Sequence, residues 1–369
     1  MTGCETSIAW LALALTPGLG HAGCRRLLQR FGSARAVFSA SEKELAEVAG
    51  VRRPVREEIK DGRGLRAAEE EADRCRRAGI AIVTMADERY PDLLRHSPDV
   101  PLVLFVKGDS GLLAGDCLAV VGARAASVYG LEVAEKYAAM LARAGLTVVS
   151  GMAMGIDAAA HRGCLTAGGR TIAVLGCGLD IVYPGQNREL YRRIGESGAL
   201  VSEYPLGTKP DAFRFPARNR IISGLSLGVL VVEAAKRSGS LITAELALEQ
   251  GREVFAIPGR VDSPKSAGTH RIVQQGGKLV QCLDDILEEL PPRLRPGQAA
   301  GDAPASVGPV PLDAAQQRVY DCLDVYPVAV DEIIRNSGFS AARVGDILLH
   351  LEMAGLVCAQ PGQQYRKST

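Results

Sequence analysis

Residues 117–151, CLAVVGARAASVYGLEVAEKYAAMLARAGLTVVSG, place one helical segment between two short apolar runs. The runs CLAVVG (117–122) and LTVVSG (146–151) are continuous and rich in valine, so each predicts a strand that is buried on both faces. Helical segments between such strands are typical of a parallel sheet. The stretch therefore predicts a strand–helix–strand unit.

The same alternation extends from about residue 80 to about residue 290 and predicts an α/β fold with helices on both faces of a parallel sheet. Beside the two runs above, the predicted strands are IAIVT (80–84), LVLFV (102–106), TIAVLGCG (171–178), ALVSE (199–203), GVLVVEA (228–234), EVFAIPG (253–259) and KLVQCL (278–283). Many of these strands end in glycine. In such sheets, ligands bind at the carboxyl ends of the strands.

The first 75 residues predict a helical domain. Helical periodicity covers Ile8–Leu15, Cys24–Phe31, Leu45–Val51 and Ile59–Ala72, and a capping box is predicted at Ser41–Glu44. The turn Thr16–Gly20 resembles a helix-hairpin-helix, whose glycine amides approach a DNA phosphate. The helix after it carries Arg25, Arg26 and Arg30, which suit either DNA contact or a solvated basic face of a structural cap.

The other end of the chain predicts a linker and a small domain. Residues 291–311 are rich in proline and glycine and predict a semi-rigid tether. Residues 312–369 predict a winged helix, with helices at Ala314–Leu323, Val330–Asn336 and Ser340–Ala354, Gly355 at C′, and a hairpin of Leu356–Gln360 and Gln364–Lys367. This domain holds five basic and seven acidic residues, which favours a protein contact over duplex DNA and leaves both open.

Composition argues against a generally basic protein, a metal-binding protein and a membrane-spanning protein. The formal net charge is +1, from 43 basic and 42 acidic residues, so any anion site is a local patch. The nine cysteines are scattered without a CxxC spacing, which predicts reduced, buried thiols and no metal site. We expect a cytoplasmic protein without a membrane span, because no signal-like segment or 18-residue apolar run appears.

Three strand ends in succession carry glycine turns. They are Gly122–Gly130 with Arg124, Ser150–Asp157, and Gly176–Gly178. Free amides, helix N-termini and an arginine together form an anion cradle. Tight packing of helix on strand explains each turn alone, whereas the set favours a surface that follows phosphates.

Residues 213–244, FRFPARNRIISGLSLGVLVVEAAKRSGSLITA, concentrate donors for phosphate. Arginine forks bind phosphate oxygens and phenylalanine faces stack on bases. Hydroxyls at the start of the next helix add further donors. The alternative is a surface loop with internal salt bridges. The donors are Arg214, Arg218, Asn219, Arg220, Lys236, Arg237, Ser238, Ser240 and Thr243.

Two pairs of residues are candidates for catalysis. Asp157 and His161 lie four residues apart on one predicted helix face and suit an acid–base pair, while Glu203 and Glu233 lie near strand ends and suit paired carboxylates. The simpler alternative is that Asp157 caps the helix and His161 is structural. Since the chain has no nucleophile elbow and no HExxH sequence, we expect no enzyme.

Several motifs resemble the DNA-processing protein A family, DprA or Smf, over essentially the whole chain. They are GARAASVYG (122–130), SGMAMGIDAAAH (150–161), TIAVLGCGLDIVYP (171–184), SEYP (202–205), FPARNRIISGLS (215–226), SGSLITA (238–244), GREVFAIPG (251–259) and GTHRIVQQGGKLV (268–280). In two places the chain departs from the family pattern: Ala123 replaces a hydroxyl residue and His270 replaces asparagine.

The resemblance implies an extended Rossmann fold at 76–290 that binds single-stranded DNA without sequence preference. It further implies a homodimer that loads the recombinase RecA during natural transformation, and no cofactor. Arg124, Arg218, Arg220 and Lys236 are carried over from the family's groove. With the strand-end turns, the predicted DNA contacts are Arg124, Ser127, Gly151, Gly155, Phe215, Arg218, Asn219, Arg220, Lys236, Ser238, Gly239, Ser240 and Thr243.

Two other functions compete with this one. A nucleotide-binding or nucleoside-phosphate-hydrolysing enzyme on a related Rossmann-like fold is the first, since the chain faintly resembles the lysine-decarboxylase-like hydrolases. The PGGxGT phosphate loop of that family is absent here. A transcription regulator led by the winged helix is the second, and the acidic residues of its third helix argue against it.

Overall fold

The computed structural model describes residues 2–294, 312–324, 326–354, 356–360 and 362–367. The chain divides into two compact units, Met1–Pro296 and Gly297–Thr369, each with a core of its own. The predicted boundary between residues 75 and 76 falls inside the larger unit, so that division stays a prediction. Of the predicted linker, residues 295–311 lie outside the described part, and Pro292–Leu294 form a 3₁₀ turn in the larger unit.

The larger unit begins with six helices. They are α1 (Thr2–Leu15), α2 (Gly20–Phe31), α3 (Ala34–Ser39), α4 (Glu42–Ala46), α5 (Arg53–Lys60) and α6 (Arg63–Arg77). The helix predicted over 45–51 is wrong in its extent, since Gly50 adopts a φ of 79° and the chain turns there. The predicted capping box is confirmed: Ser41 Oγ accepts from Glu44 N (3.3 Å), and Glu44 Oε2 accepts from Ser41 N (2.8 Å).

The turn between α1 and α2 has Gly18 and Gly20 at φ values of 75° and 59°. Two arginines of α2 have partners inside the protein. Arg25 donates to the carbonyl of Pro98, and Arg30 lies 3.5 Å from Glu47. The contact of this hairpin with DNA stays a prediction.

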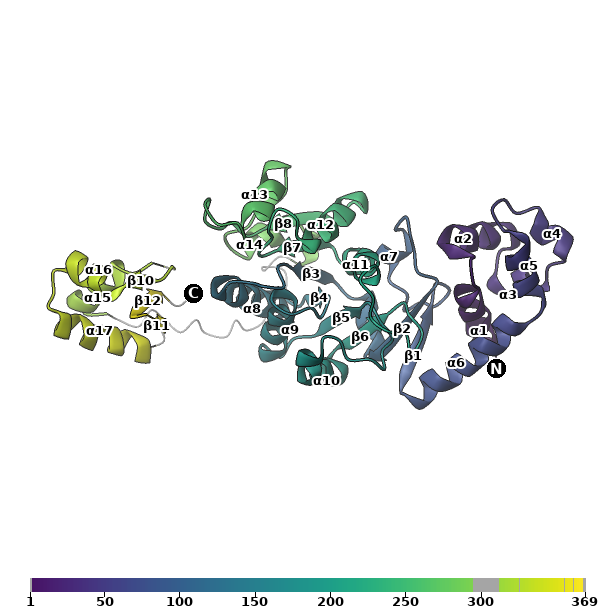
Figure 1. The fold of residues 1–369 in the computed structure, drawn as a ribbon, viewed down its shortest axis with the longest axis horizontal. Helices are drawn as coiled ribbons and strands as arrows, with labels where there is room; N and C mark the ends of the chain where they lie inside the picture. Colours follow the sequence, from purple (N-terminus) through teal and green to yellow (C-terminus); the bar gives the residue numbers. More distant parts are fainter. Residues whose placement is uncertain (1, 295–311, 325, 355, 361, 368–369) are drawn as a thin grey trace. The chain divides into compact units, whose positions relative to one another are not determined.

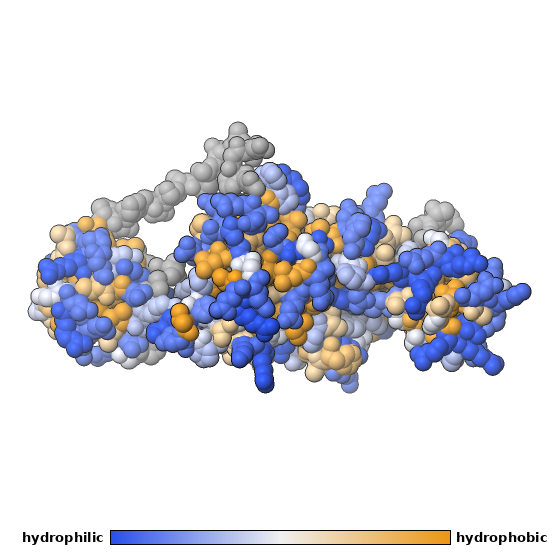
Figure 2. Space-filling model, turned by 90° about the horizontal axis from the view of Figure 1, so that it is seen from above, coloured by the Kyte–Doolittle hydropathy of each residue, from blue (hydrophilic) through white to orange (hydrophobic). Residues whose placement is uncertain are grey.

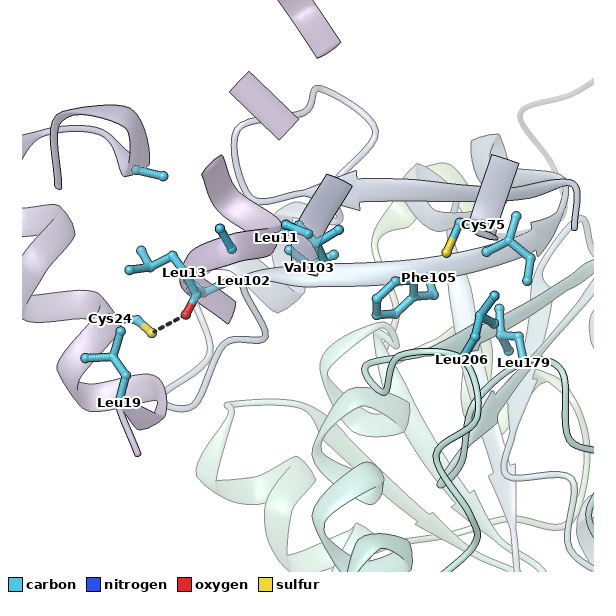
Figure 3. Packing of buried hydrophobic residues seen from close by; sticks show 14 of the residues in the cluster. Leu11, Leu13, Leu19, Cys24, Cys75, Leu102, Val103, Phe105, Leu179 and Leu206 are labelled. Atoms are coloured by element: carbon cyan, nitrogen blue, oxygen red, sulfur yellow. Dashed lines mark hydrogen bonds between the residues drawn. The ribbon is translucent and has the colours of Figure 1, made fainter. Parts of the chain in front are cut away.

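A hydrophobic cluster joins these helices to the sheet (Figure 3). Leu11 of α1 packs beside Leu102 and Val103 at the start of β2. Farther along the same strand, Cys75 of α6 lies near Phe105. Burial of these side chains fixes the helical segment against one edge of the sheet.

All nine predicted strands form one sheet, in the order β1-β2-β6-β5-β4-β3-β7-β8-β9. Every neighbouring pair from β6 to β9 is parallel, whereas β1 pairs with β2, and β2 with β6, antiparallel. The mostly parallel α/β fold is therefore confirmed, with an antiparallel pair at one edge. The bounds are β1 Ile80–Thr84, β2 Val103–Gly108, β3 Cys117–Val121, β4 Thr147–Ser150, β5 Thr171–Leu175, β6 Ala199–Ser202, β7 Gly228–Val231, β8 Glu253–Ala256 and β9 Lys278–Leu279.

Helices cover both faces of the sheet (Figure 1). In β3, Leu118 and Val120 face α8 (Val128–Arg143) and α9 (Ile156–Thr166), whereas Cys117, Ala119 and Val121 face the opposite cluster. That second cluster contains α11 (Arg214–Gly224), α12 (Gly239–Glu249) and α13 (Ala267–Gln274). The remaining helices are α7 (Asp92–Arg95), α10 (Arg188–Ser197) and α14 (Asp284–Leu287). Burial on both faces explains why the strands are continuous apolar runs.

The order of the strands reverses beside β3. The chain runs from β3 outward through β4, β5 and β6, and it then returns to place β7 on the other side of β3. At such a switch point the loops after two neighbouring strands diverge and leave a crevice. Here the crevice lies beyond the carboxyl ends of β3 and β7.

The smaller unit is a winged helix. It consists of α15 (Ala314–Asp321), β10 (Val328–Ala329), α16 (Val330–Ser337), α17 (Ala341–Met353), β11 (Val357–Gln360) and β12 (Gln364–Lys367). The three helices and the hairpin are confirmed, and β10 adds a strand that pairs with β12. Gly355 and Pro361, predicted at the C′ position and in the hairpin turn, lie outside the described residues.

The surface is mixed in polarity. Figure 2 shows hydrophilic side chains over much of the visible face, interrupted by hydrophobic patches. Within the described residues, no helix has the length and hydropathy that crossing a membrane requires.

Candidate functional site

A groove of about 670 Å³ opens beyond the carboxyl ends of the central strands, at the switch point. The turn after β3, helix α11 and the start of α12 line it. Eight of the predicted contact residues come together here. They are Arg124, Phe215, Arg218, Asn219, Ser238, Gly239, Ser240 and Thr243.

Two glycine turns interlock at the floor of this groove. Gly155 has a φ of 78°, and a Cβ there would lie 2.3 Å from the carbonyl oxygen of Ala123. The amide of Ile156 donates to that same oxygen (3.2 Å). Met152 adopts a φ of 60°, which is uncommon for a residue with a side chain. Gly155 therefore allows the loop after β4 to pack on the turn after β3.

Arg218 of α11 lies beneath the groove with only 5% of its surface exposed. Its Nη1 donates to the carbonyls of Gly151 (2.6 Å) and Val174, so it joins the ends of β4 and β5. Burial lowers the pKa of Arg218 to about 10, which leaves it charged at neutral pH. Burial also raises the pKa of the Asp157 carboxyl, and the Arg218 guanidinium opposes that rise.

Arg124 lies on the rim of the groove and is exposed. Its guanidinium carbon is 5.5 Å from the centroid of the Phe215 ring, which is within the range of a cation–π contact. The ring of Tyr183 stacks on Phe215 with centroids 5.4 Å apart and an interplanar angle of 22°. The guanidinium of Arg124 and the rings of Phe215 and Tyr183 thus lie side by side in the groove.

The start of α12 supplies hydroxyl and amide groups. Ser238 is the N-cap residue and accepts from the amide of Ser240 (3.4 Å), and the two hydroxyl oxygens are 2.8 Å apart. Lys236 and Arg237 are exposed and directly precede this N-cap. The positive end of the helix and two cations therefore favour an anion at this side of the groove.

Ser127 serves the start of α8. Its hydroxyl accepts from the amide of Gly130 (3.0 Å) as the N-cap of that helix, and its amide donates to Glu233 Oε2 (2.8 Å). The hydroxyl of Ser127 also donates to Glu233 Oε1. This contact ties the turn after β3 to the end of β7.

Arg220 points away from the lining of the groove. Its Nη2 donates to Glu203 Oε2 (2.6 Å), and its Nε lies 3.2 Å from Asp99 Oδ2. His21 of α2 approaches the same carboxylate of Glu203 (3.4 Å). Arg220 therefore joins α11 by ion pairs to the segments before β2 and after β6, with His21 of α2 beside them. Its contact with DNA stays a prediction.

Comparison with known proteins identifies the family. Residues 81–291 match the family model described as DNA recombination-mediator protein A, and residues 303–363 match the DprA winged helix domain. The chain is 34% identical to Protein Smf of Synechocystis sp., over 97% of this chain and 98% of that protein. The chain belongs to the DNA recombination-mediator protein A family.

Solved structures of DprA proteins share its fold. DNA processing protein A from Streptococcus pneumoniae has a TM-score of 0.70 and 39% identity, covering 77% of this chain and 98% of that one. A structure concerning the single-stranded DNA binding mode of DNA processing protein A from Helicobacter pylori has a TM-score of 0.52 and 29% identity, covering 57% and 94%.

The other predicted contacts lie outside the main lining of this groove. Gly151 lines a small adjoining recess of about 50 Å³ with Arg124, Phe215 and Arg218. Lys236 lies on the exposed segment between two lining residues, Ala235 and Ser238. Ser127 and Gly155 stabilise the turns behind the groove. The part of these residues in DNA binding stays a prediction.

The candidate catalytic residues are engaged elsewhere. Thr171 Oγ1 donates to Val148 O (2.7 Å), so it accepts a hydrogen bond from His161 Nδ1 (2.7 Å). Burial lowers the pKa of His161 to about 3, so the ring is neutral. Glu203 and Glu233 follow β6 and β7, which three strands separate, so the pairing of these carboxylates is wrong.

Two features of the described residues bear on the predictions for the cysteines. No group of three or more His, Cys, Asp or Glu side chains there is arranged to hold a metal ion. Five cysteines are buried, whereas Cys282 is exposed and Cys322 and Cys358 are partly exposed. The prediction that the thiols are buried is wrong for these three: Cys282 lies between β9 and α14, Cys322 directly follows α15, and Cys358 lies in β11.

Sequence reasoning missed several residues that line the groove. Tyr183, Pro210, Asp211 and Ile242 belong to its wall. The signal for Tyr183 was present, because it is the second-to-last residue of the TIAVLGCGLDIVYP stretch, which contains a predicted strand. Its stacking on Phe215, which lies much farther along the chain, depends on the packing of loops and is not visible in either motif.

Proposed function

We propose that this protein binds single-stranded DNA, without sequence preference, in the groove at the switch point. One observation carries the proposal: the exposed cation Arg124, a helix N-terminus and aromatic surface line a single groove, and Lys236 and Arg237 lie beside it. Proteins that bind single strands combine these contacts to phosphates with stacking on bases. The DNA binding mode described for the Helicobacter pylori relative supports the assignment.

Phosphates are expected along one path in the groove. Arg124 supplies a guanidinium from the turn after β3, and Lys236 and Arg237 supply charge before α12. Amides and hydroxyls of Ser238, Gly239 and Ser240 add hydrogen bonds at the N-terminus of the helix. Asn219, Thr243 and the buried charge of Arg218 complete the wall beneath this path.

Binding to fluorescein-labelled oligonucleotides tests this proposal. We expect similar affinities for mixed-sequence single strands of equal length and a steep loss of affinity with salt. Neutralisation of about three phosphates gives a slope of log K against log salt of roughly −2. A salt-independent interaction, or a strong preference for one sequence, contradicts the proposal.

The cellular role that we propose is that of a recombination mediator in the cytoplasm. The protein protects incoming single strands and loads RecA onto them during natural transformation, acting as a homodimer without a cofactor or catalysis. Membership in the DNA recombination-mediator family supports this role. The test is assembly of RecA filaments on single strands coated with single-strand-binding protein, which we expect this chain to accelerate.

The hydrolase alternative is tested by the same preparation. Release of base or phosphate from nucleoside monophosphates by pure protein supports it. We expect no release, since His161 is buried against Thr171 and Glu233 is held by Ser127.

For the winged helix we propose a protein contact. On α17, Arg343 lies 3.4 Å from Asp346, which reduces its availability to a DNA phosphate. Sequence-specific protection of duplex DNA by the full chain contradicts this assignment and favours the transcription regulator.

A further inference from the structure

Tyr183 presents exposed aromatic surface to the groove. Its surface is 42% exposed. Among the large hydrophobic side chains of the described residues, only nine are exposed. Tyr183, Met154 and Ile242 are those of the nine that line the groove or its adjoining recess. Exposed apolar surface inside a groove indicates a contact with an apolar part of the ligand.

The tyrosine is held in place from two sides. Its ring stacks on Phe215. In the turn after Tyr183, Asn187 Nδ2 donates to the carbonyl of Met152 (2.9 Å) and so ties this turn to the loop after β4. A ring fixed before binding loses little conformational entropy when a ligand stacks on it.

Phe215, by contrast, is already surrounded. The guanidinium of Arg124 lies over its ring, and Tyr183 stacks on it. Gly176 is also close, since a Cβ at that position would lie 2.9 Å from the ring of Phe215. Phe215 was predicted as a DNA contact that either stacks on a base or pins its loop to the sheet, and its surroundings favour the second of these.

We propose that Tyr183 is the residue on which a nucleobase of the bound strand stacks, with Phe215 beneath it and Arg124 binding a neighbouring phosphate. This inference rests on the proposed function and adds a base-binding residue to it. Base–aromatic stacking tolerates any base, which agrees with binding that ignores sequence.

Two probes separate stacking from phosphate binding. The first is an oligothymidylate, and the second is an abasic oligomer of equal length with the same phosphodiester backbone. Tyr183→Leu is expected to weaken binding of the oligothymidylate by roughly 5- to 100-fold. The same substitution leaves binding of the abasic oligomer within about twofold, because its phosphate contacts are intact.

Control variants distinguish the ring from the loop that holds it. Tyr183→Phe retains an aromatic face and is expected to bind both oligomers as the natural protein does. Phe213→Leu removes an aromatic ring that is 65% exposed and outside the groove lining, and is expected to change neither affinity. In a Trp10→Phe background, Tyr183→Trp introduces the chain's one indole. Its fluorescence is expected to be quenched by the oligothymidylate and not by the abasic oligomer.

The outcomes separate this inference from the proposed function. An equal loss of affinity for both oligomers in Tyr183→Leu shows a structural role and overturns the inference. Unchanged affinity for both oligomers also overturns it, while binding by the natural protein leaves the proposed function standing. If the natural protein binds neither oligomer, the proposed function fails and the inference fails with it.

Discussion

Gly155 lets the turns after β3 and β4 pack closely behind the groove. Its φ is 78°, and a Cβ at this position would lie 2.3 Å from the carbonyl oxygen of Ala123, which leaves no room for alanine. We expect Gly155→Ala to lower the free energy of unfolding by at least about 3 kcal/mol and to weaken DNA binding. Gly168→Ala is the matched control, since Gly168 has a similar φ of 73° with open space around it. It should cost about 1 kcal/mol.

Urea unfolding of both variants measures these differences. Equal losses in Gly155→Ala and Gly168→Ala would show that backbone conformation alone matters. The close packing of the two turns would then carry no energy of its own.

His161 gives the fold a dependence on pH. Its pKa is about 3 in the folded state and about 6.5 when unfolded, so the unfolded state binds the extra proton between these values. The stabilisation is fully present above pH 6.5 and is lost as the pH falls. We expect the natural protein to lose about 2 kcal/mol more than His161→Gln between pH 7 and pH 5.

Urea unfolding of both proteins at pH 7 and pH 5 measures this difference in the free energy of unfolding. Contributions from other titrating groups cancel, because both proteins contain them. Asp157 acts in the opposite sense, because burial raises its pKa in the folded state. Parallel pH profiles for the two proteins contradict the neutral state of the buried ring.

At the scale of elements, the start of α8 joins three segments through Ser127. The residue caps the helix and also binds Glu233 at the end of β7. Ser127→Ala leaves a buried carboxylate with one hydrogen bond fewer, so we expect a loss of about 2 kcal/mol in the free energy of unfolding. The control is Ser33→Ala, because Ser33 caps α3 through its own helix only and is exposed, and its loss should be about 1 kcal/mol. A smaller loss at Ser127 than at Ser33 argues against this link.

Elements were predicted better than the contacts between them. The strands are visible in the sequence because both faces of the sheet are buried, which makes each strand a continuous apolar run. The antiparallel direction of β1 and β2 was missed, since an apolar run carries no direction. The engagement of Arg220 with Asp99 and Glu203 was likewise hidden, because ion pairs between distant segments depend on the fold.

In the candidate site, too, residues in local motifs were predicted, whereas a residue placed by contacts between distant segments was missed. Arg124, Phe215 and the Ser238–Ser240 segment were found because strand-end turns converge at a switch point in this type of sheet. Tyr183 was missed because its position depends on how a long loop after β5 packs against α11.

At the scale of the whole molecule, two separate cores predict two separate unfolding transitions. Leu348 is buried in the winged helix, and Leu141 is buried between α8 and the sheet. We expect Leu348→Ala to lower the stability of the smaller unit by about 2–5 kcal/mol and to leave the larger unit unchanged. Leu141→Ala should do the reverse. Hydrogen exchange followed by mass spectrometry resolves the units, and a loss spread over both contradicts their independence.

The central claim is that single-stranded DNA binds in the groove at the switch point. The most direct measurement is the affinity of the Arg124→Glu/Lys236→Glu variant for a labelled oligothymidylate, compared with the natural protein. The control is Lys136→Glu/Arg143→Glu, which reverses two exposed charges on α8 outside the groove lining. We predict a loss on the order of 100-fold for the groove variant with an unchanged unfolding transition, and a small change for the control. A folded groove variant that keeps its affinity would contradict the account.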